Sequence, residues 1–464
     1  MDPIFLSRPE AEAINEASLT VLEQTGLRLE HPEALSLLLE AGAQRDPDGR
    51  VLVPRQLVQD ALERVGRGFT LHARTGEPAL ELVNGRTYFG PGSDALCQMD
   101  LASGKPRDSV LEDVGINARL ADALGFDFVM SMALPREVGA PHLYPRVTAQ
   151  MVRSTTRPIV ATAATLDDVV HIHHIASIAV GGEQALAERP YVLFYLEPLS
   201  PLHFDQTSMA RLLYCADHRL PFVFAPGANC GIGAPITPEG GVVQGNAESL
   251  AGLLIALLRS PDVRYVYGAN TSSADMRSAM VCYGSPEWSR TVGMYADLGQ
   301  LFDLPTWGTA GCTDAHEVDA QAAWEAYRGI LLAVQTRPTL VHDMGYMAFG
   351  ELFDPRMLAL SAEMLEEARH LMQPVDLSEE ALSTSVIDEV ARSNGLYLAH
   401  PATRKSYRKA LWISKLINRN KLGLDSEALV DRLGRRVGQF ASTHTPVLLA
   451  PEVEREIEGY LGSI

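Results

Sequence analysis

The feature that most constrains the fold is an eightfold alternation of short apolar segments with longer helical segments, which begins at Thr87. Each apolar segment ends in small or polar residues and is followed by a stretch with helical periodicity, at intervals of roughly 30 to 40 residues. Helices are predicted, for example, at 110–124, 166–179, 249–258 and 318–334. The predicted strands span residues 87–90, 126–132, 158–162, 191–197, 221–226, 265–270, 305–310 and 339–343.

Eight such units predict an α/β fold, a (β/α)8 TIM barrel, in which parallel strands close on themselves inside a ring of helices. An open, doubly wound sheet is the alternative, because it is built from the same units. No GxGxxG motif follows an early strand, however, and the number of strands suits closure. The pattern therefore favours the barrel.

The segments on either side of the barrel, which we place at 87–374, follow a different pattern. Residues 1–86 combine helical periodicity with strand-like pieces and a hairpin signal at Asn84-Gly85, which predicts an N-terminal cap. Residues 375–464 are predicted to form a C-terminal helical extension. Its apolar side chains, such as Leu411 and Trp412, are more numerous than a lid requires. We therefore expect a homo-oligomer, with packing of the tail on its own barrel as the alternative.

Composition argues against several classes of protein. The formal charge of -19, from 39 basic and 58 acidic residues, argues against binding to nucleic acid or to an anionic membrane. Five widely spaced cysteines without a CxxC pair argue against a disulfide framework and indicate a reducing compartment. The N-terminus lacks a basic segment followed by an apolar one, and no apolar run reaches about 18 residues. We therefore expect a cytoplasmic protein with neither a signal peptide nor a membrane span.

The residues just past the strands form one rim of such a barrel, and this rim is where barrel enzymes carry out catalysis. Three acidic side chains fall there, Asp94, Glu197 and Asp343. Aromatic residues lie near them in sequence, and aromatic faces beside carboxylates can hold a methylated ammonium, which donates no hydrogen bond. Each aromatic residue taken alone is more readily explained by core packing than by contact with a ligand. The candidates for such a cage are Tyr88, Tyr195, Trp307 and Tyr346.

The segment 305–325 stands out because it places small residues, a thiol and several acidic side chains around one predicted strand-to-helix turn. Gly311 allows the backbone to bend or to approach a ligand closely. The turn is expected to expose Cys312 and His316 together. The alternative is a capped connection that holds a buried cysteine.

Two other motifs are weaker candidates. The histidines at His171, His173 and His174 suggest a metal site, but they lie on a predicted helix among apolar residues, where packing is the better interpretation. The glycine-rich run 227–233 lacks the lysine of a phosphate-binding P-loop and is better explained as a rim loop. We therefore expect no metal site.

Several short pieces, in this order and spacing, resemble the trimethylamine methyltransferase superfamily, in particular its branch without pyrrolysine, which includes glycine betaine methyltransferases. The resemblance covers nearly the whole chain. The pieces that carry it are 31–42 with Val53-Pro54; 90–94 with Asp100, Gly104, Arg107 and Asp113; Asp314, Asp319 and Gln321 after Gly311; 342–345; and the tail around His400 and Trp412.

The resemblance implies a (β/α)8 barrel that moves a methyl group from a methylated amine to the Co(I) of a cobalamin. The cobalamin is carried by a separate corrinoid protein, so the chain is expected to hold no cofactor permanently. Members with pyrrolysine place it close to Gly311 or Cys312, where this chain has ordinary residues. A quaternary ammonium leaves as a neutral amine without further activation, which favours glycine betaine or a related betaine as the substrate. His316 stands where related members carry a lysine.

On this hypothesis His342 and Asp343 pair, with the carboxylate fixing the tautomer of the imidazole, and Asp94 orients the substrate or the corrinoid. A betaine also has a carboxylate, which needs hydrogen-bond donors when it is buried. The predicted donors are His316, Asn229, Asn270, Thr309 and backbone amides near Gly311, with Glu197 and Cys312 as further wall residues. A non-catalytic betaine-binding or sensing barrel is the alternative function.

Overall fold

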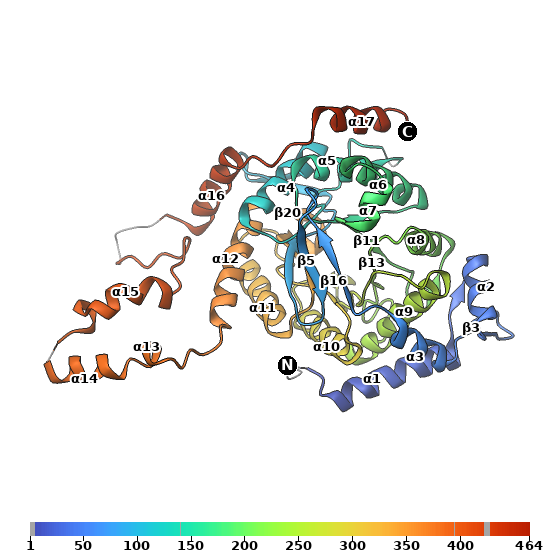
Figure 1. Cartoon of the computed structure of the whole chain (residues 1–464), viewed down its shortest axis with the longest axis horizontal. Coiled ribbons are helices and arrows are strands. Elements are labelled where there is room, and N and C mark those ends of the chain that lie inside the picture. The colour runs from blue at the N-terminus through green and yellow to red at the C-terminus, as the bar shows by residue number, and fades with distance from the viewer. Residues whose placement is uncertain (1–4, 140, 394, 422–426) are drawn as a thin grey trace.

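The computed structural model describes residues 5–139, 141–393, 395–421 and 427–464. The first four residues, which belong to the N-terminus in which we expect no signal peptide, lie outside the described residues. Figure 1 looks into a barrel whose parallel strands follow one another in chain order. A parallel bridge from Tyr267 to Thr306 and a hydrogen bond from the Asp127 amide to the Phe89 carbonyl (2.8 Å) join its two sheets. The predicted (β/α)8 barrel is confirmed. Its strands are β6 (Tyr88–Pro91), β9 (Val129–Met130), β10 (Ile159–Thr162), β11 (Val192–Leu196), β13 (Phe222–Phe224), β14 (Tyr265–Val266), β17 (Trp307–Thr309) and β18 (Leu340–Met344).

A ring of helices surrounds these strands (Figure 1). The helix predicted at 249–258 is the second half of α9, whose first half contains several glycines that lower helix propensity. One of these glycines is required by packing, because a Cβ at Gly245 would collide with the hydroxyl of Tyr295. The ring consists of α4 (Leu111–Leu124), α5 (Leu143–Ser154), α6 (Leu166–Val180), α7 (Glu183–Glu188), α8 (Gln206–Asp217), α9 (Pro238–Arg259), α10 (Pro286–Phe302), α11 (Ala320–Thr336) and α12 (Pro355–Leu371).

Among the described helices, α9 has the length and apolar composition that a membrane span would need. However, 89% of its apolar window is buried inside the protein. The helix packs against α8 and α10 of the barrel and against α1 (Arg8–Thr20) from outside it. Its apolar character is therefore explained by its place between two layers of helices.

Every second residue of a strand faces the same side of the sheet, so alternate residues of each barrel strand point into the barrel. Val160 and Leu193 belong to an inner apolar cluster, and two residues further on Thr162 and Tyr195 line the cavity described below. The hairpin of β4 (Gly68–His72) and β5 (Pro78–Val83) closes the end of the barrel at which the strands begin, which we call the lower end. Three of its leucines join the inner cluster, namely Leu71, Leu80 and Leu82.

The N-terminal segment consists of short elements packed on the outside of the barrel, together with that hairpin. The hairpin turns at 73–77 rather than at Asn84-Gly85, so the hairpin predicted at Asn84-Gly85 is wrong. These two residues instead connect β5 to the first barrel strand. Besides α1, the segment contains η1 (Val21–Thr25), β1 (Arg28–Leu29), α2 (Pro32–Glu40), β2 (Gln44–Arg45), β3 (Val51–Leu52) and α3 (Arg55–Arg64).

The C-terminal extension is helical and has two parts (Figure 1). The first part reaches away from the barrel and contains α13 (Glu379–Leu382), α14 (Thr384–Ser393) and α15 (Pro401–Ala410). The second part returns to it, where α16 (Leu429–Thr443) packs on α12 and α4, and α17 (Pro451–Leu461) packs on α6 and α5. The division of the chain at 86 and 374 into separate units stays a prediction.

Candidate functional site

A cavity of about 660 Å3 lies at the C-terminal end of the strands. This volume is in the range of sites that hold small molecules. The sequence-predicted residues that line it are Asp94, Tyr195, Glu197, Asn229, Asn270, His342, Asp343 and Tyr346. Further lining residues include Ser93, Met130, Tyr144, Thr162, Leu199, Arg211, Val281, Tyr283 and Trp288.

Three carboxylates gather in the cavity wall, as the rim analysis expected. Asp94 follows β6, and Asp343 lies near the end of β18. Both have a left-handed backbone (φ 54° for Asp94 and 74° for Asp343) that residues other than glycine seldom adopt. Gly92 allows the two segments to approach, because a Cβ there would lie only 3.2 Å from the Asp343 carboxylate. Strained backbone of this kind is often found at functional sites. Glu197 comes from the end of β11.

The surroundings of these carboxylates favour their protonated forms. Burial raises the pKa of Asp94 to about 7, although hydrogen bonds from Thr162 and Ser131 oppose the rise, and the charges of Asp343 and Glu197 add to it. Burial likewise raises the pKa of Asp343 and of Glu197. A cation in the cavity would stabilise all three ionised carboxylates at once.

A chain of hydrogen bonds links three of the predicted residues. The Asn270 amide donates to the Tyr195 hydroxyl (2.8 Å), and this hydroxyl donates to the Glu197 carboxylate (2.8 Å). Asn270 follows β14, so this chain joins two strands that are not neighbours in the barrel. It fixes the orientation of the Tyr195 ring in the cavity wall.

His342 contacts both β17 and Asp343, through different ring nitrogens. Its Nδ1 lies 2.9 Å from the Gly308 carbonyl, which can only accept a hydrogen bond, so Nδ1 carries the proton. The Asp343 carboxylate lies 3.4 Å from Nε2, on the other side of the ring. The predicted pair of His342 and Asp343 is therefore present at Nε2, whereas the Gly308 carbonyl accounts for the proton on Nδ1. The ring lies over the indole of Trp307, with 4.3 Å between centroids.

Three aromatic residues that line the cavity, Tyr144, Tyr283 and Trp288, were missed by the sequence analysis. Tyr283 follows a short hairpin, β15 (Ser273–Asp275) and β16 (Met280–Cys282), and Trp288 lies in the first turn of α10. The Tyr283 ring lies 4.3 Å from the Trp288 ring and 5.4 Å, edge to face, from the Tyr346 ring. The rings of Tyr283, Trp288 and Tyr346 form one wall of the cavity. Tyr283 and Trp288 do not follow a barrel strand directly, so the strand pattern could not have predicted them.

The segment 305–325 supports this wall from behind. Asp314 accepts hydrogen bonds from the backbone amides of Tyr283 (2.8 Å) and the next residue (3.0 Å), and the Asp314 amide donates to Glu325 (2.9 Å). Cys312 is buried and its thiol points to the Tyr283 carbonyl (3.5 Å). Burial raises the thiol's pKa well above its ordinary value, so Cys312 is not an activated nucleophile. Gly311 beside it has a left-handed backbone.

Six predicted substrate-binding residues do not line the cavity, namely Gly311 and Cys312 of the segment just described and four others. Tyr88 lies at the start of its strand, where its hydroxyl accepts a hydrogen bond from the Glu81 amide of the lower hairpin (3.1 Å). Trp307 and Thr309 are buried below His342. His316 lies in a separate hollow of about 570 Å3, edge to face with Phe349. Tyr88, Trp307, Thr309 and His316 are therefore excluded from direct contact with a ligand in the cavity in this conformation.

Arg211, a cavity residue that the sequence analysis did not find, adds a positive charge to the cavity wall. It lies on α8 and reaches over the strand ends, where it donates to the carbonyls of Ala163 and Glu197. Within the described part of the chain, three buried polar atoms of the cavity wall have no hydrogen-bond partner. They are Nε of Arg211, Nε1 of Trp288 and Oδ1 of Asp94. A ligand or ordered water in the cavity could supply partners for such groups.

The histidines of α6 pack against other helices. His171 contacts the Tyr460 hydroxyl of α17 (2.7 Å), and His173 contacts the Tyr214 hydroxyl of α8 (3.0 Å). Burial lowers the pKa of His173 to about 4. Over the described ranges, no group of three or more histidine, cysteine or acidic residues is arranged to hold a metal ion.

Comparison with solved structures supports the fold. The structure of the monomethylamine methyltransferase MtmB from Methanosarcina barkeri aligns with a TM-score of 0.50 over 98% of this chain and 87% of that chain, at 12% sequence identity. At this identity the likeness shows the barrel fold and nothing about the substrate.

Sequence comparison shows the family. The glycine betaine methyltransferase of Desulfitobacterium hafniense (strain Y51) is 25% identical over 98% of this chain and 96% of its own length. Trimethylamine methyltransferase MttB of D. hafniense (strain DSM 10664 / DCB-2) is 26% identical over 96% and 91%, and MttB of Methanosarcina thermophila is 27% identical over 86% and 84%. The profile of trimethylamine methyltransferase (MTTB) matches residues 3–458. The chain therefore belongs to the trimethylamine methyltransferase family.

Proposed function

We propose that the protein transfers a methyl group from a small quaternary amine with a carboxylate, glycine betaine or a related betaine, to the Co(I) of a corrinoid carried by a partner protein. The observation that carries the proposal is the composition of one cavity, which is lined by three carboxylates, by aromatic rings that include Tyr283, Trp288 and Tyr346, and by Arg211, whose Nε has no hydrogen-bond partner. A zwitterion needs an acidic and aromatic surface for its ammonium group and a basic surface for its carboxylate. The family supplies the class of reaction, methyl transfer from a methylated amine.

The cationic end of the substrate is assigned to the wall of Tyr283, Trp288 and Tyr346, together with Asp94 and Asp343. A methylated ammonium donates no hydrogen bonds, so its binding depends on aromatic faces and on nearby negative charge. Burial raises the pKa values of the carboxylates, and a bound cation would lower them again. The cavity is thus better satisfied with a cation than without one.

The anionic end is assigned to Arg211. Its Nε is buried and unpartnered, and a guanidinium is the side chain best suited to a carboxylate. Asn229 and the unpartnered indole N–H of Trp288 are further candidate donors in the same cavity. This set replaces His316 and Thr309, which lie elsewhere.

The methyl acceptor approaches from the mouth of the cavity, since about 660 Å3 is too small for a corrinoid and a substrate together. In the transfer, Co(I) contributes the electron pair of the new carbon–cobalt bond. The carbon–nitrogen pair leaves with the nitrogen as a neutral tertiary amine, so no general acid is required. The residues of this chain hold the ammonium in line and exclude water.

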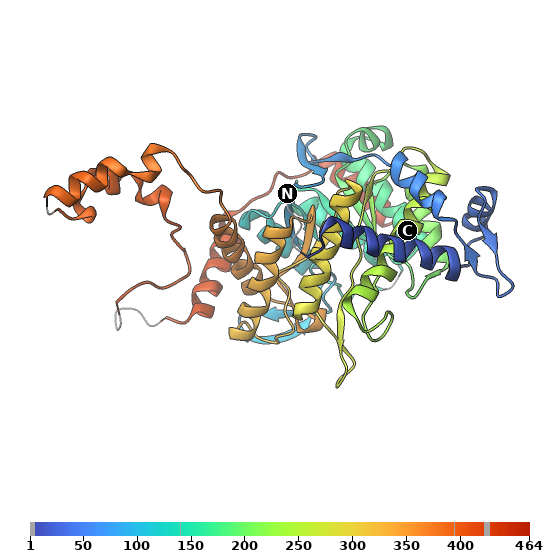
Figure 2. The same cartoon turned by 90° about the horizontal axis from the view of Figure 1, so that it is seen from below.

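Apolar side chains are exposed around the mouth. Figure 2 shows the hairpin of β15 and β16 projecting from this end of the barrel. Met276 at its tip is 68% exposed, and it approaches Ile236 above Gly231 in the loop that follows Asn229. Such a surface fits transient docking of the corrinoid protein. All five cysteines are free thiols, which agrees with the cytoplasm as the proposed compartment.

The test is an anaerobic assay with the purified protein, a Co(I)-corrinoid protein and a panel of glycine betaine, proline betaine, carnitine, choline and tetramethylammonium. We expect the absorption spectrum of methyl-Co(III) with at least one carboxylated substrate and little with choline or tetramethylammonium. Absence of methylation with every betaine would refute the proposal. Tight binding of a betaine without transfer to any corrinoid would favour the non-catalytic barrel instead.

A further inference from the structure

Residues 197–202, which follow β11, form part of the cavity wall, and we call them the β11 loop. The residues of its middle part that line the cavity are Pro198, Leu199 and Ser200. Charged groups of the cavity lie on either side of them in the chain, because Glu197 begins the loop and Arg211 lies on α8, which starts shortly after the loop. The position of the β11 loop therefore affects the wall and both charged groups at once.

Glu248 of α9 holds the β11 loop, although its own side chain does not line the cavity. Its carboxylate accepts hydrogen bonds from the Ser200 hydroxyl (2.7 Å) and from the Leu202 amide (2.6 Å). Hydrogen bonds to a charged acceptor are stronger than those between neutral groups. The loop is therefore fixed at two points to a helix of the barrel.

Gln244, one turn earlier on α9, joins Glu248 to a second loop of the cavity. Its side-chain amide donates to the Glu248 carboxylate (3.1 Å) and to the Gly233 carbonyl (2.8 Å). Gly233 lies in the glycine-rich run 227–233, in which Asn229 lines the cavity. Two side chains of α9 thus tie two loops of the cavity wall together.

The N-terminal segment holds the far end of the β11 loop. The strand β1 pairs in parallel with β12 (His203–Phe204), which follows the loop directly. The Arg28 amide donates to the Leu202 carbonyl (2.9 Å), and His203 contacts the Glu30 carboxylate (2.9 Å). Leu202 is thus held through its amide by Glu248 and through its carbonyl by β1, so a shift of the loop would break one of these contacts.

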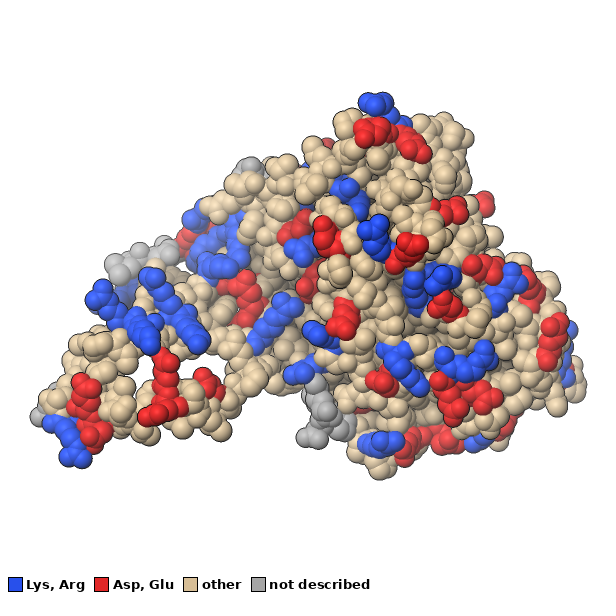
Figure 3. Space-filling model, viewed as in Figure 1, with Lys and Arg blue, Asp and Glu red and all other residues tan. Residues whose placement is uncertain are grey.

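The charge of Glu248 has no counter-ion. The side chain is fully buried, and no basic residue in the described part of the chain forms an ion pair with it. Burial raises the pKa of Glu248 to about 7, although the hydrogen bonds that it accepts oppose the rise. On the face of the molecule in Figure 3, by contrast, acidic side chains are intermixed with basic ones. A buried carboxylate without a counter-ion costs free energy, and residues of this kind are concentrated at functional sites.

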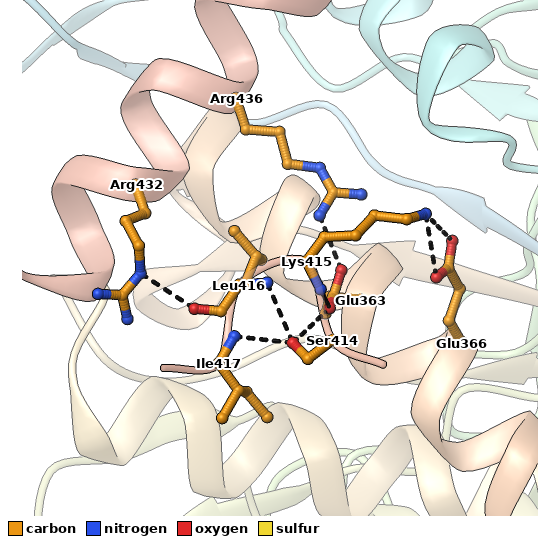
Figure 4. A network of polar contacts seen from close by, with 8 residues as sticks. All are labelled: Glu363, Glu366, Ser414, Lys415, Leu416, Ile417, Arg432 and Arg436. Atoms are coloured by element: carbon orange, nitrogen blue, oxygen red, sulfur yellow. Dashed lines mark hydrogen bonds and ion pairs between the residues drawn. The ribbon is translucent and has the colours of Figure 1, made fainter. Parts of the chain in front are cut away.

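Glu363 of α12 makes the same two hydrogen bonds to a segment that does not line the cavity (Figure 4). Its carboxylate accepts from the Ser414 hydroxyl (2.7 Å) and from the Lys415 amide (2.7 Å). Glu363 is also buried, but unlike Glu248 it has an ion-pair partner, Arg436 of α16 (2.7 Å). It therefore provides a matched control, in which the same contact is lost outside the candidate site.

We propose that Glu248 is a positioning residue for the substrate, which acts by holding the β11 loop where it completes the cavity wall. The inference rests on the proposed function for the identity of the substrate, whereas the contacts that carry it do not depend on the reaction. Without this acceptor, the loop is no longer fixed in the position in which Leu199 and Ser200 line the cavity. Because Glu248 does not touch the substrate, its loss should weaken substrate binding more than it slows transfer at saturation.

The first test is hydrogen exchange of the free protein measured by mass spectrometry, which needs neither a substrate nor a corrinoid protein. Glu248→Ala should speed exchange in residues 198–204 about tenfold or more, because the Leu202 amide loses its acceptor. Ser200→Ala, which removes one of the two bonds without opening a space in the core, should give a smaller change in the same direction. Unchanged exchange of this segment in both variants would overturn the proposal.

Two further variants separate the hold on the loop from general destabilisation. Glu363→Ala should leave the exchange of residues 198–204 as in wild type and speed that of residues 414–417 instead. Glu248→Gln should restore most of the protection, because its amide oxygen can accept from Leu202 and its NH2 group can donate to the Ser200 hydroxyl. Faster exchange of residues 198–204 in Glu363→Ala, or no restoration by glutamine, would contradict the assigned contacts.

The second test measures KM and kcat for the substrate of the panel that is turned over fastest. In Glu248→Ala we expect KM to rise about tenfold and kcat to change less than about threefold, whereas Glu363→Ala should keep the wild-type KM. An unchanged KM in Glu248→Ala, or an equal rise in Glu363→Ala, would overturn the positioning role and leave the proposed methyl transfer intact. Absence of turnover with every substrate would instead refute the proposed function, and hydrogen exchange would still decide whether Glu248 holds the loop.

Discussion

The raised pKa of Asp94 predicts that removing its charge stabilises the protein. The pKa rises from 3.8 to about 7, which corresponds to about 4 kcal/mol against the ionised form at 1.36 kcal/mol per pH unit. Because the folded-state pKa is the higher one, the folded state binds this proton more tightly than the unfolded state does. The contribution of Asp94 to the free energy of unfolding is therefore fully present below the unfolded pKa of 3.8 and is lost as the pH rises from there to about 7. At pH 8, Asp94→Asn should therefore raise stability by about 2 to 4 kcal/mol, the lower figure allowing for relaxation of the cavity.

The assay is thermal unfolding of wild type and Asp94→Asn between pH 5 and pH 9, without ligand. The wild type should lose Tm as pH rises from 5 to about 7 and should lose little more from this group above 7, whereas the variant should lose less over the lower range. Asp108→Asn, at an exposed carboxylate that pairs with Arg136, is the control and should follow the wild type. A variant that unfolds at the same or a lower temperature than wild type at pH 8 would refute the reasoning. Glycine betaine should raise the Tm of wild type more than that of the variant.

Three further predictions concern other residues. His342→Gln should reduce methyl transfer about 100-fold, because the imidazole lines the cavity and helps to position the substrate in line, and should change Tm little, because the glutamine amide can still donate to the Gly308 carbonyl; retained turnover would remove His342 from the site. Arg211→Lys should raise KM for carboxylated substrates about tenfold or more and leave KM for tetramethylammonium unchanged; an equal rise for both would contradict its assignment. Burial lowers the pKa of His173 from 6.5 to about 4, so up to about 3 kcal/mol of stability is lost as pH falls between these values. His173→Asn should show a smaller loss in acid unfolding measured by circular dichroism, and an unchanged loss would disprove the cause.

The barrel and its carboxylates could be predicted from sequence because both follow from local pattern. Eight repeated units specify the closed sheet, and the C-terminal ends of parallel strands meet at one rim. Asp94, Glu197 and Asp343 therefore reach the cavity. Tyr88 was assigned to the same rim, although it begins its strand and so lies at the opposite end.

The aromatic wall and the arginine could not be predicted in this way. Tyr283 and Trp288 belong to a hairpin and a helix start inserted after β14, and their place depends on the distant Asp314. Arg211 reaches the cavity from the middle of α8. The helical periodicity of the sequence does not distinguish this position from other polar positions on a helix that lies outside the barrel. Trp307 was a reasonable cage candidate by composition, but the inner face of a closed barrel buries it under His342.

The central claim is tested most directly by following the methyl group itself. Glycine betaine with deuterated N-methyl groups is incubated anaerobically with the protein and a Co(I)-corrinoid protein, and both products are measured by mass spectrometry. The account predicts one trideuteromethyl group on the corrinoid for each dimethylglycine formed, and no transfer when the corrinoid starts as Co(III). Loss of betaine without label on the corrinoid, or no loss of any betaine in the panel, would contradict it.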